Sequence, residues 1–337
     1  MSENNAGSRE AALAAARRAL LQKRIQGAGA AAAAPRGIPR RPDRERAPTS
    51  YAQQRLWFID QLSPGNPSYN IPTPVRIEGP LDAGALERAV GEMVRRQDAL
   101  RTTLLPDEAG NPVQHVAPAG PFALPVTDLE PVPAEEREAE LERRLDAEAA
   151  VPFDLAAGPL FRARLFRLAP DLHVLLLTVH HVVGDGFSNH LMVREVSALY
   201  GAFARGLPSP LPELRVQYGD FAVWQRNRLQ GAAFEKQVAY WTGELRGAPP
   251  LLELPADFAR PPLHGHRGGA ERLELSAETT DRLRALARAE GATLFNVLLA
   301  ALAAHLGRYA RQDDVVVGIP VDSRGLPELE EIVGIFL

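Results

Sequence analysis

The segment HVLLLTVH, residues 173–180, is the feature that most constrains how this chain folds. Its six central residues are all apolar or β-branched. A nearly continuous run of this kind is typical of a central strand covered on both faces. Packing layers must then lie on either side of it, so we expect an α/β or mixed α+β protein. A chain of 337 residues is long enough for two lobes.

The rest of the globular sequence interleaves expected helices and strands without strict alternation. The stretch LFRARLFRL, residues 160–168, alternates apolar and charged residues, which predicts a half-buried strand. Further strands are expected near 100–105, 112–117, 270–275 and 314–319. Hydrophobic spacing predicts helices near 82–97, 134–149, 188–206, 218–229, 232–246, 277–290 and 293–309, with Asp82 as an N-cap.

The N-terminal region has a composition of its own. Residues 9–26 have the spacing of an amphipathic helix, and a stretch rich in Gly, Ala, Pro and Arg follows it. We therefore expect residues 1–47 to form a helix and a linker. The helix is either part of the linker or a docking element for a partner polypeptide.

Two adjacent histidines and a Gly-Asp-Gly turn end the buried strand. Successive side chains of a strand point to opposite faces, so one of His180 and His181 faces a buried layer and the other an opening. The glycines beside Asp185 let its carboxylate turn back toward the histidines, where it either holds a ring in one tautomer or pairs with an arginine. Because such a group is costly to bury, we interpret it as a functional site.

Composition and motifs narrow the remaining classes. The net charge of −4 gives no reason to expect nucleic acid or a membrane as a partner. The absence of cysteine excludes disulfides, a thiol nucleophile and Cys-ligated zinc. His264 and His266 lack a third ligand, so no metal is expected. The N-terminus lacks the pattern of a secretory signal, and we expect a cytoplasmic protein.

The segment HHVVGDGFS resembles the active-site motif of nonribosomal peptide synthetase condensation domains. Alone, it also suits the wider acyltransferase superfamily that shares this motif. The resemblance extends over residues 48–337 through four further stretches in the family's order: SYAQQRLWFIDQL (50–62), RRQDALRTTL (95–104), YGDFAVWQ (218–225) and VGIPVDSRGLPELEEIVGIFL (317–337). Gln97 and Asp98 stand where the second motif usually has His and Glu.

The resemblance implies a chloramphenicol acetyltransferase-like fold, in which two lobes enclose a tunnel. Residues 48–225 would be the N-terminal lobe and 226–337 the front part of the C-terminal lobe. The resemblance stops within the fifth motif, so we expect a C-terminally truncated chain whose second lobe is incomplete.

The resemblance also implies the reaction. A donor acyl or peptidyl thioester on an upstream peptidyl carrier protein is attacked by the amine of an aminoacyl group on a downstream carrier, and an amide forms. The phosphopantetheine arms belong to the carriers, so the chain itself needs no bound cofactor. An adjacent adenylation domain is the other expected partner. The single Asp185, in place of a paired-Asp variant, disfavours the heterocyclising subtype.

The roles of the site residues follow from the same motifs. His181 is expected to face the tunnel as the catalytic residue, and His180 to form hydrogen bonds inside the lobe. Asp185 is expected to be structural and paired with an arginine, with Gly186 offering its backbone N–H to the oxyanion. The candidate arginines are Arg96, Arg101 and Arg324, and further tunnel or motif residues are Ser188, Gln53, Arg55 and Trp224, the last favoured as a core anchor.

Elementary acid–base chemistry limits what a histidine base contributes. A free α-amine has a pKa of about 8 and imidazole one of about 6.5, so part of the amine is already neutral near pH 7. Holding the amine and the thioester in line is worth up to roughly 7–11 kcal/mol. We therefore expect His181 to position the amine and to accept its proton late. The alternatives are a stand-alone CoA-dependent acyltransferase and a non-catalytic platform that binds carriers.

Overall fold

The computed structural model describes residues 37–258, 269 and 271–337 of the chain. Two compact units are distinguished, Met1–Pro39 and Arg40–Leu337. Only residues 37–39 of the first unit are described, so the expected helix at 9–26 lies outside the described residues, as do His264 and His266. All helices and strands of the described residues lie in the second unit.

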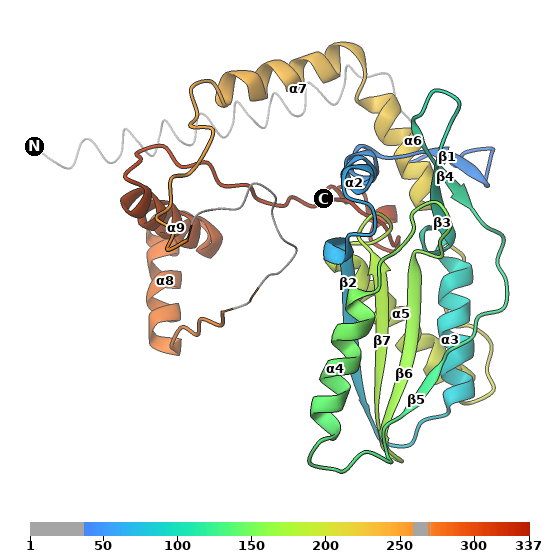
Figure 1. Ribbon diagram of the computed structural model, residues 1–337. Helices are drawn as coiled ribbons and strands as arrows, with labels where there is room; N and C mark the ends of the chain where they lie inside the picture. The colour runs from blue at the N-terminus through green and yellow to red at the C-terminus, as the bar shows by residue number, and fades with distance from the viewer. Residues whose placement is uncertain (1–36, 259–268, 270) are drawn as a thin grey trace, which may run out of the picture. The chain divides into compact units, whose positions relative to one another are not determined.

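A four-stranded sheet carries the strand on which the candidate site depends. Its order is β2 (Asn70–Glu78), β7 (Leu172–His180), β6 (Phe161–Ala169) and β5 (Val126–Asp128), so β7 is an inner strand (Figure 1). The strands β2 and β6 are both antiparallel to β7, whereas β5 is parallel to β6. The expectation of a central, buried strand at 173–180 is confirmed.

The edge strand β2 shows why its sequence hid it. Pro72 and Pro74 face Thr178 and Leu176 of β7 in the ladder. Proline cannot donate a ladder hydrogen bond and is confined to edge strands or bulges, so two prolines argue against a strand in a sequence. On β2 they belong to an edge, where they also remove two donors that another strand would need.

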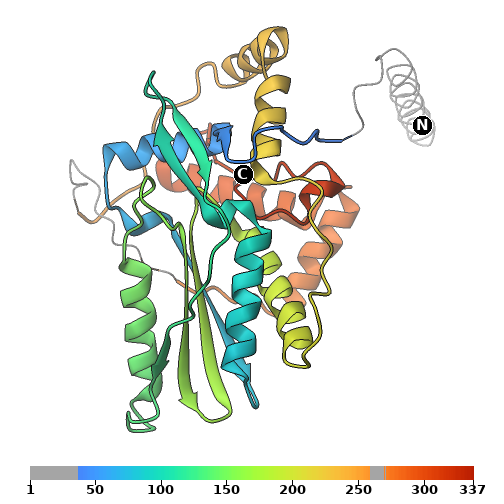
Figure 2. The ribbon, with the colours of Figure 1, turned by 90° about the vertical axis from the view of Figure 1, so that its right-hand side faces the viewer.

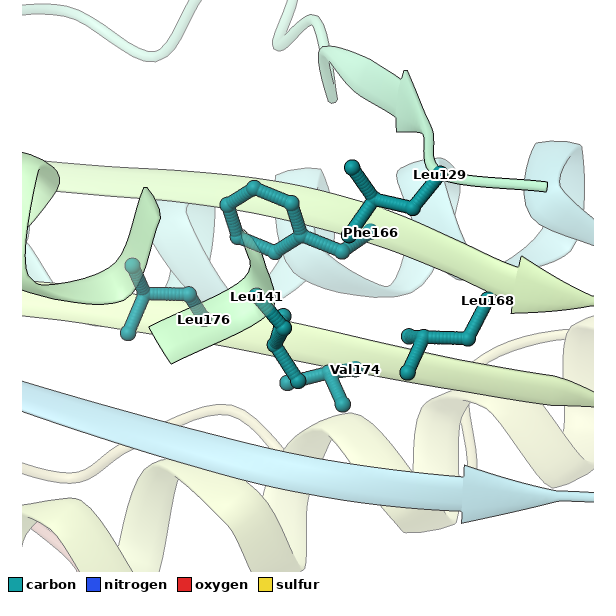
Figure 3. Packing of buried hydrophobic residues seen from close by; sticks show 6 residues of the cluster. All are labelled: Leu129, Leu141, Phe166, Leu168, Val174 and Leu176. Carbon is teal, nitrogen blue, oxygen red and sulfur yellow. The ribbon is translucent and has the colours of Figure 1, made fainter. Parts of the chain in front are cut away.

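Helices cover both faces of this sheet. Figure 2 shows α4 (Arg137–Ala150, green) on one face, with α3 (Ala83–Arg96, teal) and α5 (Gly186–Phe203, yellow-green) on the other. A tight cluster of buried side chains from α4, β6, β7 and the residue after β5 forms the α4 side (Figure 3): Leu129, Leu141, Phe166, Leu168, Val174 and Leu176. The nearly continuous apolar run of β7 therefore serves two packing layers.

A smaller antiparallel sheet and two helices complete the first part of the unit. The sheet has the order β1 (Arg46–Pro48), β4 (Pro112–Val116) and β3 (Thr102–Pro106). The one-turn helices η1 and η2 span Pro67–Tyr69 and Asp98–Arg101. Helix α2 (Tyr51–Leu62) begins with a capping box in which Ser50 and Gln53 exchange hydrogen bonds. Helix α6 (Tyr218–Arg228) has an acidic residue, Asp220, in its first turn.

The later residues form helices as expected but not the expected strands. Helices α7 (Gly231–Glu244), α8 (Ala277–Ala289) and α9 (Leu294–Ala310) agree closely with the sequence analysis, and α8 and α9 contact each other. The strands expected at 270–275 and 314–319 were wrong for the described residues of those segments. Neither segment pairs with another strand, and Leu273 and Val316 are exposed instead of packed. An apolar alternating sequence forms a strand only where a partner supplies the ladder.

The last residues pack into the first part of the unit. After η3 (Pro327–Leu329), Ile332, Val333, Ile335 and Phe336 are all almost fully buried. The buried hydroxyl of Tyr218 donates to the carbonyl of Ile335 at 2.6 Å and lies 2.7 Å from Ser50 Oγ. Its ring stacks edge-on against Phe336 at 5.1 Å. This C-terminal segment, residues 329–337, is therefore part of the core beside α6.

Membrane-spanning length and hydrophobicity are missing from every single helix of the described residues. Helices α8 and α9 meet the criterion only when taken together, and they are bent by 103° at their junction.

Gly334 gives a direct test of this packing. A Cβ at Gly334 would overlap the ring of Tyr218, which is fully buried and hydrogen-bonded and so cannot move aside. We expect Gly334→Ala to lower the free energy of unfolding by about 1–3 kcal/mol, the usual cost of overpacking. Urea denaturation measures the change. Gly318→Ala is the matched control, because a Cβ there meets no atom within 4 Å; equal effects of the two substitutions would contradict the packing.

Candidate active site

The first histidine of the pair is buried at the end of β7. His180 is 2% exposed, and its ring lies 6.2 Å from that of Tyr69 and 6.0 Å from that of Phe153. Its Nδ1 accepts a hydrogen bond from the N–H of Val182 at 3.1 Å. Burial, followed by the adjacent His181, lowers the pKa of His180 to about 4. The ring is therefore neutral near pH 7, with its proton on Nε2.

The second histidine is only half-buried. The backbone N–H of His181 donates to the carbonyl of Tyr69 at 2.8 Å, which fixes the residue just beyond the β2–β7 ladder. Its Nδ1 lies 2.8 Å from the carbonyl oxygen of Gly184. A carbonyl only accepts, so Nδ1 carries a proton. In the neutral ring, Nε2 then has a free lone pair and can accept a proton or an N–H hydrogen bond.

The aspartate of the turn is both a helix cap and half of a buried ion pair. Oδ1 of Asp185 accepts from the N–H of Ser188 at 2.9 Å and thereby caps α5. Arg324 grips the carboxylate with two nitrogens, at 2.8 Å to Oδ2 and 3.0 Å to Oδ1, and the N–H of Phe336 adds a bond to Oδ2 at 3.1 Å. Both charged side chains are at most 3% exposed. Burial raises the pKa of Asp185, but its bonds to Arg324 and the backbone outweigh burial and lower it overall.

The hydroxyl of Ser188 joins the helix cap to the C-terminal segment. It accepts from the N–H of Gly334 and from Arg324, each at 3.1 Å. Its single proton goes either to Asp185, at 2.8 Å, or to the carbonyl of Gly334, at 2.9 Å. Ser188 is fully buried, so it belongs to this network and not to an open surface.

Two aromatic rings hold the guanidinium of the ion pair. The Arg324 Cζ atom lies 4.6 Å from the ring centre of Phe187 and 4.1 Å from that of Phe336. Arginine stacks well on aromatic faces because its guanidinium is planar and weakly hydrated. The rings therefore keep the charge partly shielded from water while the carboxylate neutralises it.

The other two candidate arginines have different partners. Arg96 pairs with Glu195 of α5 at 2.9 Å, and Arg101 with Asp98 at 2.7 Å. Only Arg324 of the three therefore contacts Asp185, and it is 139 residues away in the sequence.

The remaining candidates are spread over several environments. Gln53 is buried and bonds to Ser50 and to Gln114, whereas Arg55 is exposed on α2. Trp224 is half-buried, with its ring 6.1 Å from that of Phe221. Gly186 is exposed at the start of α5, where a Cβ would meet no atom within 4 Å. Among the described residues, no group of three or more His, Asp or Glu side chains is placed to hold a metal ion.

Sequence reasoning missed several residues that hold the site. The carbonyl of Gly184 orients His181, and Tyr218, Gly334 and Phe336 hold the segment that reaches Asp185. All four lie in stretches that resemble family motifs, which was the available signal. Their pattern gave no indication of which side chains or backbone groups meet.

The buried histidine makes stability depend on pH. Below pH 6.5 an unfolded imidazole takes up a proton that folded His180 refuses until about pH 4. Stability is therefore lost as the pH falls from 6.5 to 4, by roughly 3 kcal/mol in all. We expect His180→Asn, which keeps an acceptor near Nδ1, to flatten this part of the curve of unfolding free energy against pH.

Urea denaturation at several pH values checks this result. His305→Asn, on the exposed surface of α9, should keep the wild-type slope. An unchanged slope in His180→Asn would contradict a neutral, buried His180.

Comparison with protein families places this geometry among known proteins. Residues 43–337 match the family model described as the condensation domain. One part of the linear gramicidin synthase of Brevibacillus parabrevis is 46% identical over 290 residues, which are 86% of this chain and 6% of that protein. Phosphinothricin tripeptide synthetase PhsC from Streptomyces viridochromogenes is 42% identical over 330 residues, 98% of this chain and 30% of that protein. The chain thus spans well under half of these relatives.

Solved structures show the same fold. The X-domain in its complex with OxyB from teicoplanin biosynthesis matches with a TM-score of 0.78 and 30% identity, over 91% of this chain and 66% of that one. The first condensation domain of the CDA synthetase matches with a TM-score of 0.72 and 28% identity, over 87% of this chain and 69% of that one.

Proposed function

The chain belongs to the condensation domain family, and on that basis we propose that it serves a nonribosomal peptide synthetase by forming an amide bond. The donor is an acyl or peptidyl thioester, and the acceptor is the amine of an aminoacyl group. Both are carried on the phosphopantetheine arms of upstream and downstream carrier proteins, so the arms arrive as parts of the substrates. The fixed tautomer of half-buried His181 is the observation that carries this proposal.

The reaction then needs one proton acceptor at one position. The amine nitrogen attacks the thioester carbonyl carbon, and a C–N bond forms as the carbonyl π electrons move to oxygen. The nitrogen becomes cationic and loses a proton to Nε2 of His181, which has a free lone pair while Nδ1 stays bonded to Gly184. Collapse of the intermediate breaks the C–S bond, and the departing thiolate takes the proton from Nε2.

The backbone of the turn is proposed to assist the chemistry without a charged side chain. Gly186 is exposed at the N-terminus of α5, where helix N–H groups favour negative charge. We assign its N–H to the developing oxyanion. Asp185 is committed to Arg324 and to backbone donors, which supports a structural role for it.

The domain limits and location are part of the same proposal. Residues 48–225 form the N-terminal lobe and 226–337 the front part of the C-terminal lobe, with 1–47 as helix and linker. An adenylation domain adjoins it in the parent protein. The lack of a signal pattern and of cysteine supports a cytoplasmic location.

The proposed role of His181 predicts a specific loss. We expect His181→Ala to lower the rate of amide formation from carrier-bound substrates by roughly a hundredfold or more, because both the hydrogen bond to the amine and the proton acceptor are removed. Single-turnover assays over pH 6–9 provide the measurement. His305→Ala, which removes an exposed imidazole on α9, should leave the rate unchanged.

The same pH series decides between positioning and base catalysis. A wild-type rate that follows an imidazole titration, with this dependence absent from His181→Ala, would contradict late proton acceptance and favour a true general base. Turnover of acyl-CoA without any carrier protein would point to a stand-alone acyltransferase. Carrier binding with no amide formation by the wild-type chain would point to a binding platform.

A further inference from the structure

Gln97 is a fully buried polar residue at a junction of the fold. It is the C-cap of α3 and precedes η2, and it stands where the family motif usually has histidine. A buried amide has to find partners for both its oxygen and its nitrogen, since an unsatisfied polar group costs stability.

The partners of the Gln97 amide match its two ends. Nε2 donates to Oε1 of Glu195 and to the carbonyl oxygen of Glu331, both at 3.0 Å. Oε1 accepts from the backbone N–H of Val333, also at 3.0 Å. Two acceptors thus face the nitrogen and one donor faces the oxygen. Only a neutral amide in this orientation satisfies all three groups, because a carboxylate has no proton to donate.

Charged groups surround this amide on several sides. Glu195 of α5 is 3% exposed and is also bonded by Arg96 at 2.9 Å. Burial raises the pKa of Glu195, against the opposing effects of Arg96, Gln97 and Arg194. Asp98, the next residue in the chain, is paired with Arg101. A second negative charge at position 97 would therefore face Glu195 with little water to screen it.

The residues that follow Val333 are those that reach the candidate active site. The N–H of Gly334 donates to Ser188, the carbonyl of Ile335 accepts from Tyr218, and the N–H of Phe336 donates to Asp185. Gln97 holds the two residues on either side of Ile332, directly before this run. The register of the run on α5 therefore depends on where Gln97 places Val333.

We propose that Gln97 is a positioning residue, whose amide holds residues 331–333 so that Gly334 and Phe336 reach Ser188 and Asp185 behind the His181 loop. For its effect on catalysis, this proposal rests on the proposed function. The structural part stands independently, because it concerns the order of the C-terminal segment alone.

Gln97→Glu tests the hydrogen-bonding role with little change in volume. At pH 8 the ionised carboxylate repels Glu195 and the Glu331 carbonyl, so we expect the amides of 333–336 to exchange with deuterium roughly tenfold faster than in the wild type. At pH 5 the two rates should approach each other. A protonated carboxyl donates once and accepts once, so it restores the bonds to Glu195 and Val333.

The sign of this pH effect follows from linkage. Burial beside Glu195 raises the pKa of the introduced carboxyl above its unfolded value, so the variant loses stability as the pH rises and regains it as the pH falls. Hydrogen exchange followed by mass spectrometry, as the ratio of variant to wild type at each pH, gives the measurement. Gln237→Glu, on the exposed face of α7, is the matched control and should give a ratio near one at both pH values.

Further variants keep the test decisive. Gln97→Leu should accelerate exchange at both pH values, because it removes the bonds without adding a titrating group. If Gln97→Glu does not fold, Gln97→Asn, whose amide is one carbon shorter, should accelerate exchange without a pH dependence. A ratio near one for Gln97→Glu or Gln97→Asn at pH 8, or an equal ratio at pH 5 and 8 for Gln97→Glu, would overturn the proposal.

An activity measurement separates this proposal from the proposed function. With carrier-bound substrates, the rate of amide formation by Gln97→Glu should fall at pH 8 and recover relative to wild type toward pH 5.5. Absence of amide formation by the wild type would contradict the proposed function and leave the exchange result standing. Normal activity at pH 8 together with fast exchange would contradict the effect of Gln97 on catalysis.

Discussion

The buried ion pair between Asp185 and Arg324 is the interaction on which the site depends. It joins the first turn of α5 to a residue 139 positions later, and both side chains are at most 3% exposed. A buried pair is weak evidence for net stability, because desolvation of both charges offsets their attraction. Removing one partner is different, since it leaves an uncompensated charge. The pair therefore acts as a geometric constraint, one that fixes the turn between His181 and α5.

Each side of this constraint has its own support. On the helix side, Asp185 caps α5, so the carboxylate cannot shift without weakening the helix start. On the other side, Gly334 lies against the ring of Tyr218, close enough that no larger residue fits. The Tyr218 hydroxyl in turn holds Ile335. Packing and hydrogen bonding thus converge on one short segment, and the histidine on the opposite side of the turn inherits its position from them.

The strongest elements of the fold could be predicted from local sequence. The run that forms β7 and the turn after it were recognisable because burial on two faces leaves a nearly continuous apolar run. By contrast, β2 was missed because Pro72 and Pro74 argue against a strand until its place at a sheet edge is known. The segments 270–275 and 314–319 have strand-like sequences, yet a strand needs a partner, which local sequence does not reveal.

The same limit applies to the site. The sequence placed His181 and Asp185 together because they are four residues apart and flanked by glycines. It offered three arginines for Asp185 and no means of choosing, since the choice depends on tertiary packing. The role of Gln97 was equally hidden. Its departure from the family motif was visible, but its partners Glu195 and Val333 are contributed by distant segments.

The most direct test of this account is a double-mutant cycle on Asp185 and Arg324, measured by urea denaturation at pH 7. Asp185→Asn keeps the helix cap, and Arg324→Gln keeps a donor, so the cycle isolates the ionic interaction. We expect each single variant to lose about 3–5 kcal/mol and the double variant to lose clearly less than their sum, with a coupling energy of about 2 kcal/mol or more. Additive losses, with a coupling energy near zero, would contradict the claim that this pair holds the His181 turn in place.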